Sequence, residues 1–272
     1  MRGKPIKADA FGVCRLTGNP GKFVKSHIIP KALTPKEDPG GPLVEADGKK
    51  RPKRQWDSWY DPSLVIRKGE DHLAEIDSSA LRILSEHKLI WKSWRDQDEL
   101  GIDHIANDEE ALLGIRLLEG VDQTALGVFA VSLLWRAGSS DLPAMHEFNV
   151  PNDILESARL VTLGKREFEP NEFPVKMFQY ATKGPMHNLT PMNLERPLAT
   201  EKPEPFFRIF ANGVFFHIVD TTARSNFDVG KAKWFLGNSD ELAVLCFDFE
   251  KSTQARFFEN TLDHYHALMR RQ

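Results

Sequence analysis

The decisive stretch of this chain is Cys14-Arg15-Leu16-Thr17-Gly18, which is followed shortly by Lys25-Ser26-His27-Ile28-Ile29-Pro30. A Cys-x-x-Cys knuckle holds zinc because two thiolates at that spacing bind one ion. Here Thr17 occupies the second cysteine position, so the sequence contains half of such a knuckle. A histidine just downstream can act as a metal ligand or as a general base. A lone cysteine, in contrast, is most often a small buried hydrophobic residue.

The local sequence predicts a hairpin over residues 11–33 that presents His27 on its second strand. Its turn is Gly18-Asn19-Pro20-Gly21, where proline fixes φ and glycine permits positive φ. Residues 34–58 are rich in proline and glycine, so we expect a loop there. That loop contains the basic run Lys49-Lys50-Arg51-Pro52-Lys53-Arg54.

The segment resembles the start of HNH-type endonucleases of bacteria and phages, which have a treble-clef, ββα-metal fold. These proteins carry a Cys-x-x-Cys-Gly knuckle, a His-Ile-Ile-Pro strand and a second cysteine pair, and the resemblance covers roughly residues 11–94. It implies that His27 is the general base that activates water and that Cys14 is a surviving structural ligand. It also implies a divalent metal at the scissile phosphate, a nucleic-acid substrate and a setting in phage defence.

Three departures from that family leave a second hypothesis open. Thr17 replaces a knuckle cysteine, and Ser26 stands where many of these enzymes have an acidic metal ligand. The only other cysteine is Cys246, so a four-cysteine zinc site is excluded by count. The alternative is a catalytically inactive treble-clef relative that binds nucleic acid or a protein partner as a regulatory module. The sequence does not distinguish DNA from RNA as the target.

Candidate metal ligands follow the basic loop, because in the ββα arrangement a helix residue helps to hold the metal. Glu70-Asp71-His72 and Asp77 are the candidates, and Asp71 and His72 occupy the place of the family's second cysteine pair. A site of His27, Asp71 and His72 would suit Mg²⁺, Mn²⁺ or Zn²⁺. The alternative is that Glu70 and Asp71 cap a helix while His72 is a surface residue.

Charge is distributed unevenly along the chain, which has a formal net charge of −3. Residues 1–68 contain 15 Lys+Arg and 7 Asp+Glu, a net of +8, so the remainder carries −11. A basic part beside an acidic remainder is typical of a phosphate-facing surface, or else of a solvated loop. The candidate phosphate-binding residues are Lys25, Lys49, Lys50, Arg51, Lys53 and Arg54. The aromatic residues Trp56, Trp59 and Tyr60 either stack on bases or, more commonly, anchor the loop on the core.

Composition predicts a soluble globular protein, with 41% hydrophobic and 28% charged residues among 272. No apolar run reaches the roughly 18–20 residues that span a bilayer, so we expect no membrane association. The basic N-terminus has no apolar stretch behind it, which argues against a secretory signal. Two cysteines far apart in sequence favour a reducing compartment, so we expect a cytoplasmic location.

The element pattern predicts an α+β fold. We expect a small treble-clef or ββα-like module with a basic loop in residues 1–95, and a helical segment plus a C-terminal α+β region in residues 96–272. Asn212-Gly213 between two apolar runs is a strong hairpin signal. Predicted strands are 64–67, 173–181, 206–210, 214–219 and 242–249. Predicted helices run from Asp77 or Ser78 to about Trp94, over 108–118, over 122–136, from Pro151 to Gly164, and over 253–271 as a closing helix.

Overall fold

The computed structural model describes residues 10–34, 43–45, 53–102, 112–196, 204–223 and 228–270. Within these ranges the fold is mixed α+β, with sheets of three, six and two strands. The strands are β1 (Phe11–Val13), β2 (Pro20–His27), β3 (Leu43–Glu45), β4 (Lys53–Gln55), β5 (Tyr60–Ile66), β6 (Leu112–Glu119), β7 (Val175–Tyr180), β8 (Met192–Arg196), β9 (Glu204–Ala211), β10 (Val214–Val219) and β11 (Glu241–Phe247). The α-helices are α1 (Arg67–Glu86), α2 (Gln123–Gly138), α3 (Asn152–Thr162) and α4 (Thr253–Arg270).

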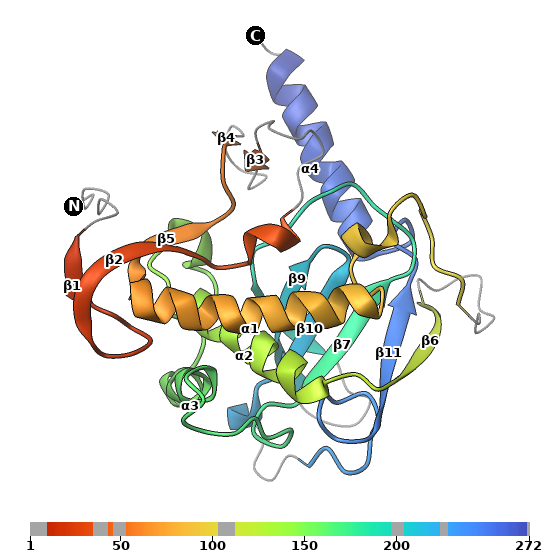
Figure 1. The fold of residues 1–272 in the computed structure, drawn as a ribbon. Coiled ribbons are helices and arrows are strands. Elements are labelled where there is room, and N and C mark those ends of the chain that lie inside the picture. The colour runs from red at the N-terminus through yellow and green to blue at the C-terminus, as the bar shows by residue number, and fades with distance from the viewer. Residues whose placement is uncertain are drawn as a thin grey trace.

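The N-terminal part is a three-stranded antiparallel sheet, ordered β1-β2-β5, followed at once by α1. The predicted hairpin is confirmed, because β1 pairs with β2 across a turn that contains Gly18 at φ +73°. β2 then pairs with β5, and His27 lies opposite Tyr60 at the end of the pairing. Figure 1 shows this small sheet at one side of the molecule, with α1 running from it across the middle.

The first helix begins ten residues earlier than the sequence predicted. α1 starts at Arg67 and ends at Glu86, so Asp77 lies in mid-helix instead of at the N-cap. The residue before the helix, Ile66, has no side chain that could cap it, so the sequence carries no capping residue at the true start of α1. Asp77 is a residue of the capping type near an apolar stripe, and the prediction placed the start there. The stripe Glu70, Leu73, Asp77 and Ala80 repeats every three to four residues, as one face of a single helix requires.

The predicted helix over 108–118 is wrong where the structure describes it. Leu112–Glu119 is strand β6, which pairs antiparallel with β11 at one edge of the six-stranded sheet. Exposure alternates along it, with Ile115 and Leu117 exposed and Gly114 buried between its neighbours. That period of two belongs to a strand, and a short apolar run can be mistaken for a helix when this alternation is not used.

The other predicted elements of the C-terminal part are confirmed. α2 is buried almost throughout, and α3 ends before Gly164, which has φ +65°. Asn212 and Gly213 both have positive φ, 51° and 85°, and join β9 to β10 as a tight hairpin. The six-stranded sheet is ordered β6-β11-β7-β10-β9-β8, and only the β11–β7 pair is parallel.

One principal core connects the two parts of the chain. It extends from Cys14 in the small sheet to Val244 in β11, and Phe129 of α2 packs edge-on against Phe216 of β10. Helix α1 packs beside α2, and α2 contacts β9 of the large sheet (Figure 1). The core therefore draws on residues from both sides of position 95, where we placed a domain boundary. Among the described residues, no helix combines the length and apolar character needed to cross a membrane.

A buried arginine fastens the small sheet to the helices. Arg136 of α2 is 1% exposed, and it donates to Asp77 of α1 at 2.5 and 3.0 Å. It also donates at 3.4 Å to the backbone carbonyl of His27 at the end of β2. This guanidinium is therefore shared by β2, α1 and α2.

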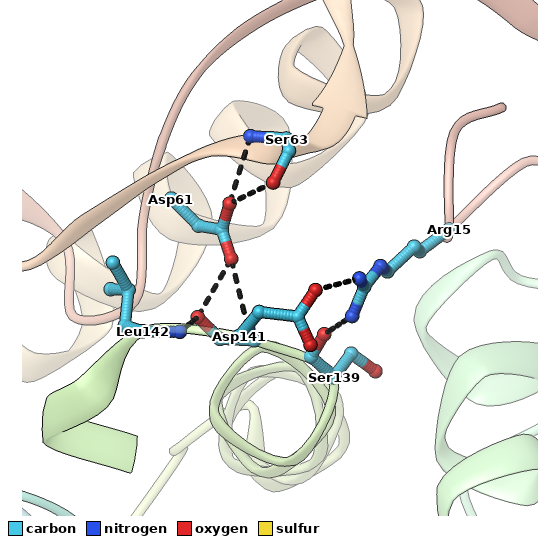
Figure 2. Close-up of polar contacts among 7 residues, drawn as sticks. Arg15, Asp61, Ser63, Ser139, Asp141 and Leu142 are labelled. Atoms are coloured by element: carbon cyan, nitrogen blue, oxygen red, sulfur yellow. Dashed lines mark hydrogen bonds and ion pairs between the residues drawn. The ribbon is translucent and has the colours of Figure 1, made fainter. Parts of the chain in front are cut away.

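A second polar junction joins β5 to the end of α2 (Figure 2). Asp61 of β5 is 1% exposed and accepts four hydrogen bonds, from the backbone and hydroxyl of Ser63, the hydroxyl of Ser140 and the backbone of Asp141. Arg15 from the knuckle donates to the Ser139 carbonyl and to Asp141 in the same place. The buried carboxylate is thus satisfied, as a desolvated charge must be.

We predict that Arg136→Met lowers the free energy of unfolding by about 3–5 kcal/mol, because it leaves Asp77 partly buried without its partner. Urea unfolding followed by circular dichroism measures the change. Arg82→Ala is the matched control, since Arg82 forms an exposed ion pair with Glu86 and its loss costs about 0.3–0.5 kcal/mol. The double variant Arg136→Met/Asp77→Leu regains most of the lost stability. Equal stability of Arg136→Met and Arg82→Ala would contradict this account.

Candidate functional site

His27 lies at the C-terminal end of β2, and its side chain is 21% exposed. Its Nε2 is 3.1 Å from Oδ1 of Asp57, and its ring meets the Tyr60 ring edge-on at 6.1 Å. An ionised carboxylate accepts hydrogen bonds but does not donate them, so Nε2 carries the proton in neutral His27. The Nδ1 lone pair is then the basic position of the ring, and no described residue hydrogen-bonds to it.

Two lysines approach the same carboxylate. Lys25 Nζ lies 4.0 Å and Lys31 Nζ 3.9 Å from the carboxylate oxygens of Asp57, and Lys25 also sits 4.3 Å above the Tyr60 ring. Burial acts to raise the pKa of Asp57, but the His27 hydrogen bond and the nearby charges outweigh it and lower that pKa. The site is thus an imidazole–carboxylate pair with two exposed ammonium groups beside it.

Behind His27 lies a second, more buried polar layer. Glu70, in the first turn of α1, faces Ser26 and Arg136, and burial raises the pKa of its carboxyl despite these neighbours. Neither Ser26 Oγ nor Glu70 Oε2 completes a hydrogen bond of normal geometry with a described residue. Glu70 and Asp77 are therefore the α1 carboxylates that face the strand of His27.

The two predicted metal ligands on α1 lie elsewhere. Helical residues are separated by about 100°, so Asp71 and His72 point away from the Glu70 face. Asp71 is exposed beside Arg67 at 3.5 Å, and His72 Nε2 is 2.5 Å from the carbonyl oxygen of Thr162 in α3. Among the described residues, no three His, Cys, Asp or Glu side chains are gathered as a metal site. The side chains in the described ranges therefore do not form a metal site made of protein ligands alone.

Cys14 is fully buried, and its surroundings are apolar. Its Sγ accepts the backbone N–H of Thr17 at 3.4 Å. Gly69 of α1 comes so close that a Cβ there would lie 3.0 Å from the Cys14 sulfur and 3.0 Å from Val65. Leu16 and Leu73 complete the same core. The helix start that would carry the second ligand pair of a treble clef is thus packed directly onto the cysteine.

The predicted phosphate-binding residues are only partly described. Lys53 and Arg54 are exposed on β4, and Lys25 is half exposed on β2 beside His27. Lys49, Lys50 and Arg51 lie outside the described residues. The residues that sequence reasoning missed are Asp57 and Lys31. Asp57 stands 30 positions from His27, across a loop, and no periodic signal could have connected the two.

A second partly buried histidine lies on the other face of the large sheet. His187 is surrounded by aromatic rings, including Phe210 at 5.0 Å, and burial lowers its pKa. Its Nδ1 is 2.6 Å from the Pro185 carbonyl oxygen, and its Nε2 is 2.8 Å from the amide nitrogen of Gln254. Both ring nitrogens are occupied, so this histidine ties the 185–187 loop to α4 and has no nitrogen left for a substrate.

No protein-family model matches the chain, and no curated protein or solved structure matches it either. The relation to HNH-type endonucleases therefore rests on the quoted motif, and the role of His27 stays a prediction.

We predict that the knuckle is stable without zinc. Structural zinc sites contribute folding free energy, so chelators unfold the domains that need them. Here core packing surrounds Cys14 instead. Dialysis against EDTA should leave the melting temperature unchanged, and mass spectrometry should find no stoichiometric zinc. A melting temperature that falls on chelation and recovers with added zinc would contradict this expectation.

We predict that Asp57 stabilises the protein in a pH-dependent way. Its pKa is lowered on folding from 3.8, so its contribution is complete above that value and is lost as the pH falls through the lower folded pKa. The difference in free energy of unfolding between wild type and Asp57→Asn should shrink as the pH falls below about 4. Asp71→Asn, at an exposed carboxylate, is the control. A difference that does not vary with pH would argue against this ion cluster.

Proposed function

We propose that this protein is an HNH-like nuclease that acts on a nucleic-acid phosphodiester at the His27 site. The observation that carries the proposal is the pairing of His27 with Asp57 at 3.1 Å between two lysines. An imidazole oriented by a carboxylate is the usual arrangement of a general base. Lysines bind backbone phosphate without regard to sequence, which fits a nucleic-acid substrate.

The chemistry follows from the ring orientation. Nε2 donates to Asp57, so Nδ1 is the nitrogen that takes a proton from an attacking water. The oxygen of that water then bonds to phosphorus, and the bond from phosphorus to the leaving oxygen breaks. Asp57 stabilises the imidazolium that forms, and Lys25 and Lys31 are the described cations that offset the negative charge of the phosphate. In the resembled family a divalent metal supplies further charge stabilisation, but the side chains described here do not gather around one.

A specific observation favours a second candidate, a catalytically inactive relative that binds nucleic acid. Asp71 and His72 point away from His27, and Cys14 is enclosed by the core. A protein that has lost its metal ligands but kept its lysines would still bind phosphate. Direct comparison of cleavage and binding separates the two candidates.

We predict that His27→Ala lowers cleavage by about 100-fold or more, the usual contribution of a general base. Plasmid DNA and structured RNA are incubated with the protein in Mg²⁺, Mn²⁺ or Zn²⁺, and products are resolved on gels. His146→Ala is the matched control, because His146 is exposed and lies after Pro143–Met145, apart from the site. His72→Ala tests the outer face of α1.

The outcomes assign the function. Cleavage lost in His27→Ala and kept in His146→Ala and His72→Ala supports the nuclease. Cleavage lost in His72→Ala but kept in His27→Ala would move the reaction to the outer face of α1. Binding without cleavage under every condition would support the inactive relative.

A further inference from the structure

Tyr60 is the aromatic residue that lies at the His27 site. It stands opposite His27 in the β2–β5 ladder, and direct cross-strand neighbours project their side chains from the same face of a sheet. The two rings meet edge-on with their centroids 6.1 Å apart, and Tyr60 is partly exposed. Its neighbour Trp59, in contrast, packs against the core and donates its indole N–H to Glu45 at 3.1 Å. Trp59 therefore anchors the chain, whereas Tyr60 is presented beside the proposed base.

The hydroxyl of Tyr60 has no hydrogen-bond partner in the described part of the chain. The Lys25 ammonium lies 4.3 Å from the centroid of its ring and the His27 ring lies at its edge, but no described residue bonds to its oxygen. The other polar side chains of the site are engaged, since His27, Lys25 and Lys31 all lie 3.1 to 4.0 Å from the Asp57 carboxylate. A phenol can donate its proton to a reacting group. The site thus presents an unengaged proton donor beside the ring of its proposed proton acceptor.

Hydrolysis of a phosphodiester gives such a donor a task. The attacking water and the leaving oxygen lie roughly in line, on opposite sides of phosphorus. The group that takes a proton from the water is therefore not placed to protonate the leaving oxygen in the same step. His27 is the proposed base for the water, so the leaving oxygen needs a second residue. Tyr60 is near His27 and still has its hydroxyl available.

We propose that Tyr60 is the general acid of this site and protonates the leaving oxygen. This inference rests on the nuclease function proposed above. Nδ1 of His27 takes a proton from water, the water oxygen bonds to phosphorus, and the bond from phosphorus to the leaving oxygen breaks as that oxygen receives the Tyr60 proton. The Lys25 ammonium at the ring stabilises the phenolate that forms. Solvent then returns a proton to Tyr60 and removes the proton from His27.

The test compares leaving groups that differ in their need for a proton. The ends of the wild-type products first identify which bridging oxygen leaves. Two oligonucleotides are then prepared, one with the ordinary bond and one with sulfur in place of that oxygen, because a thiolate is a weaker base than an alkoxide and leaves without a proton. Tyr60→Phe keeps the ring and removes only the hydroxyl. It should slow cleavage of the oxygen substrate by about 100-fold or more, the usual contribution of a general acid, and leave the sulfur substrate nearly unchanged.

Two further variants complete the experiment. His27→Ala should slow both substrates, because a base acts on the attacking water whatever group leaves. Tyr180→Phe is the matched control, since it also removes one hydroxyl, which here bonds to Gln254 in the interior. It should change neither rate.

Equal slowing of the oxygen and sulfur substrates by Tyr60→Phe would overturn the inference, because the hydroxyl would then act on binding or on the fold. Unchanged cleavage of both substrates would overturn it as well. Failure of this inference is distinguishable from failure of the proposed function. Cleavage that depends on His27 but not on the Tyr60 hydroxyl keeps the nuclease and removes the acid. A wild-type protein that cleaves neither substrate removes both.

Discussion

The burial of one guanidinium group constrains the rest of this structure. Arg136 is almost completely removed from water, and a charge in that position is tolerated only when its partners are in place. Those partners are the Asp77 carboxylate on α1 and the carbonyl oxygen of His27 on β2. Because the three elements must meet at one group, the end of β2 has a fixed position relative to both helices. His27 therefore sits on backbone held from behind by a buried ion pair, with its ring facing outward to Asp57.

The turn around Cys14 is held by core packing among the described residues. The Cys14 sulfur accepts the backbone N–H of Thr17, which closes the turn. Gly69 permits a close approach of α1 to the sulfur, because a Cβ at this position would lie only 3.0 Å from Cys14 Sγ. Small zinc domains need the ion because they bury little apolar surface, but a chain of 272 residues has a core large enough to stabilise such a turn. A threonine at position 17 is compatible with this local fold, because packing and the Thr17 N–H hold the turn.

Secondary structure that depends on neighbouring residues was predictable from the sequence, whereas contacts between residues far apart in the chain were not. The hairpin at Asn212-Gly213 and the buried helix α2 follow from turn residues and apolar content, and both are confirmed. The start of α1 was misplaced because Asp77 has the composition of a cap, whereas its carboxylate is used in mid-helix by Arg136. A helix was predicted where Leu112–Glu119 forms a strand, because the alternation of exposed and buried residues extends over only a few positions. Within the site, His27 and Lys25 belong to one motif, but Asp57 is brought to them by the β2–β5 pairing alone.

The site combines two demands that the fold separates. The proposed proton transfer requires the base to be held near 3 Å from its partners, and β2, Arg136 and Asp57 would hold His27 in this way. Phosphate binding tolerates larger variation in position, because Coulomb attraction acts at long range. The residues that we propose for it on β4, Lys53 and Arg54, are exposed. Strand β4 ends at Gln55, two residues before Asp57, so the proposed phosphate-binding surface and the carboxylate that contacts His27 are adjacent in the chain.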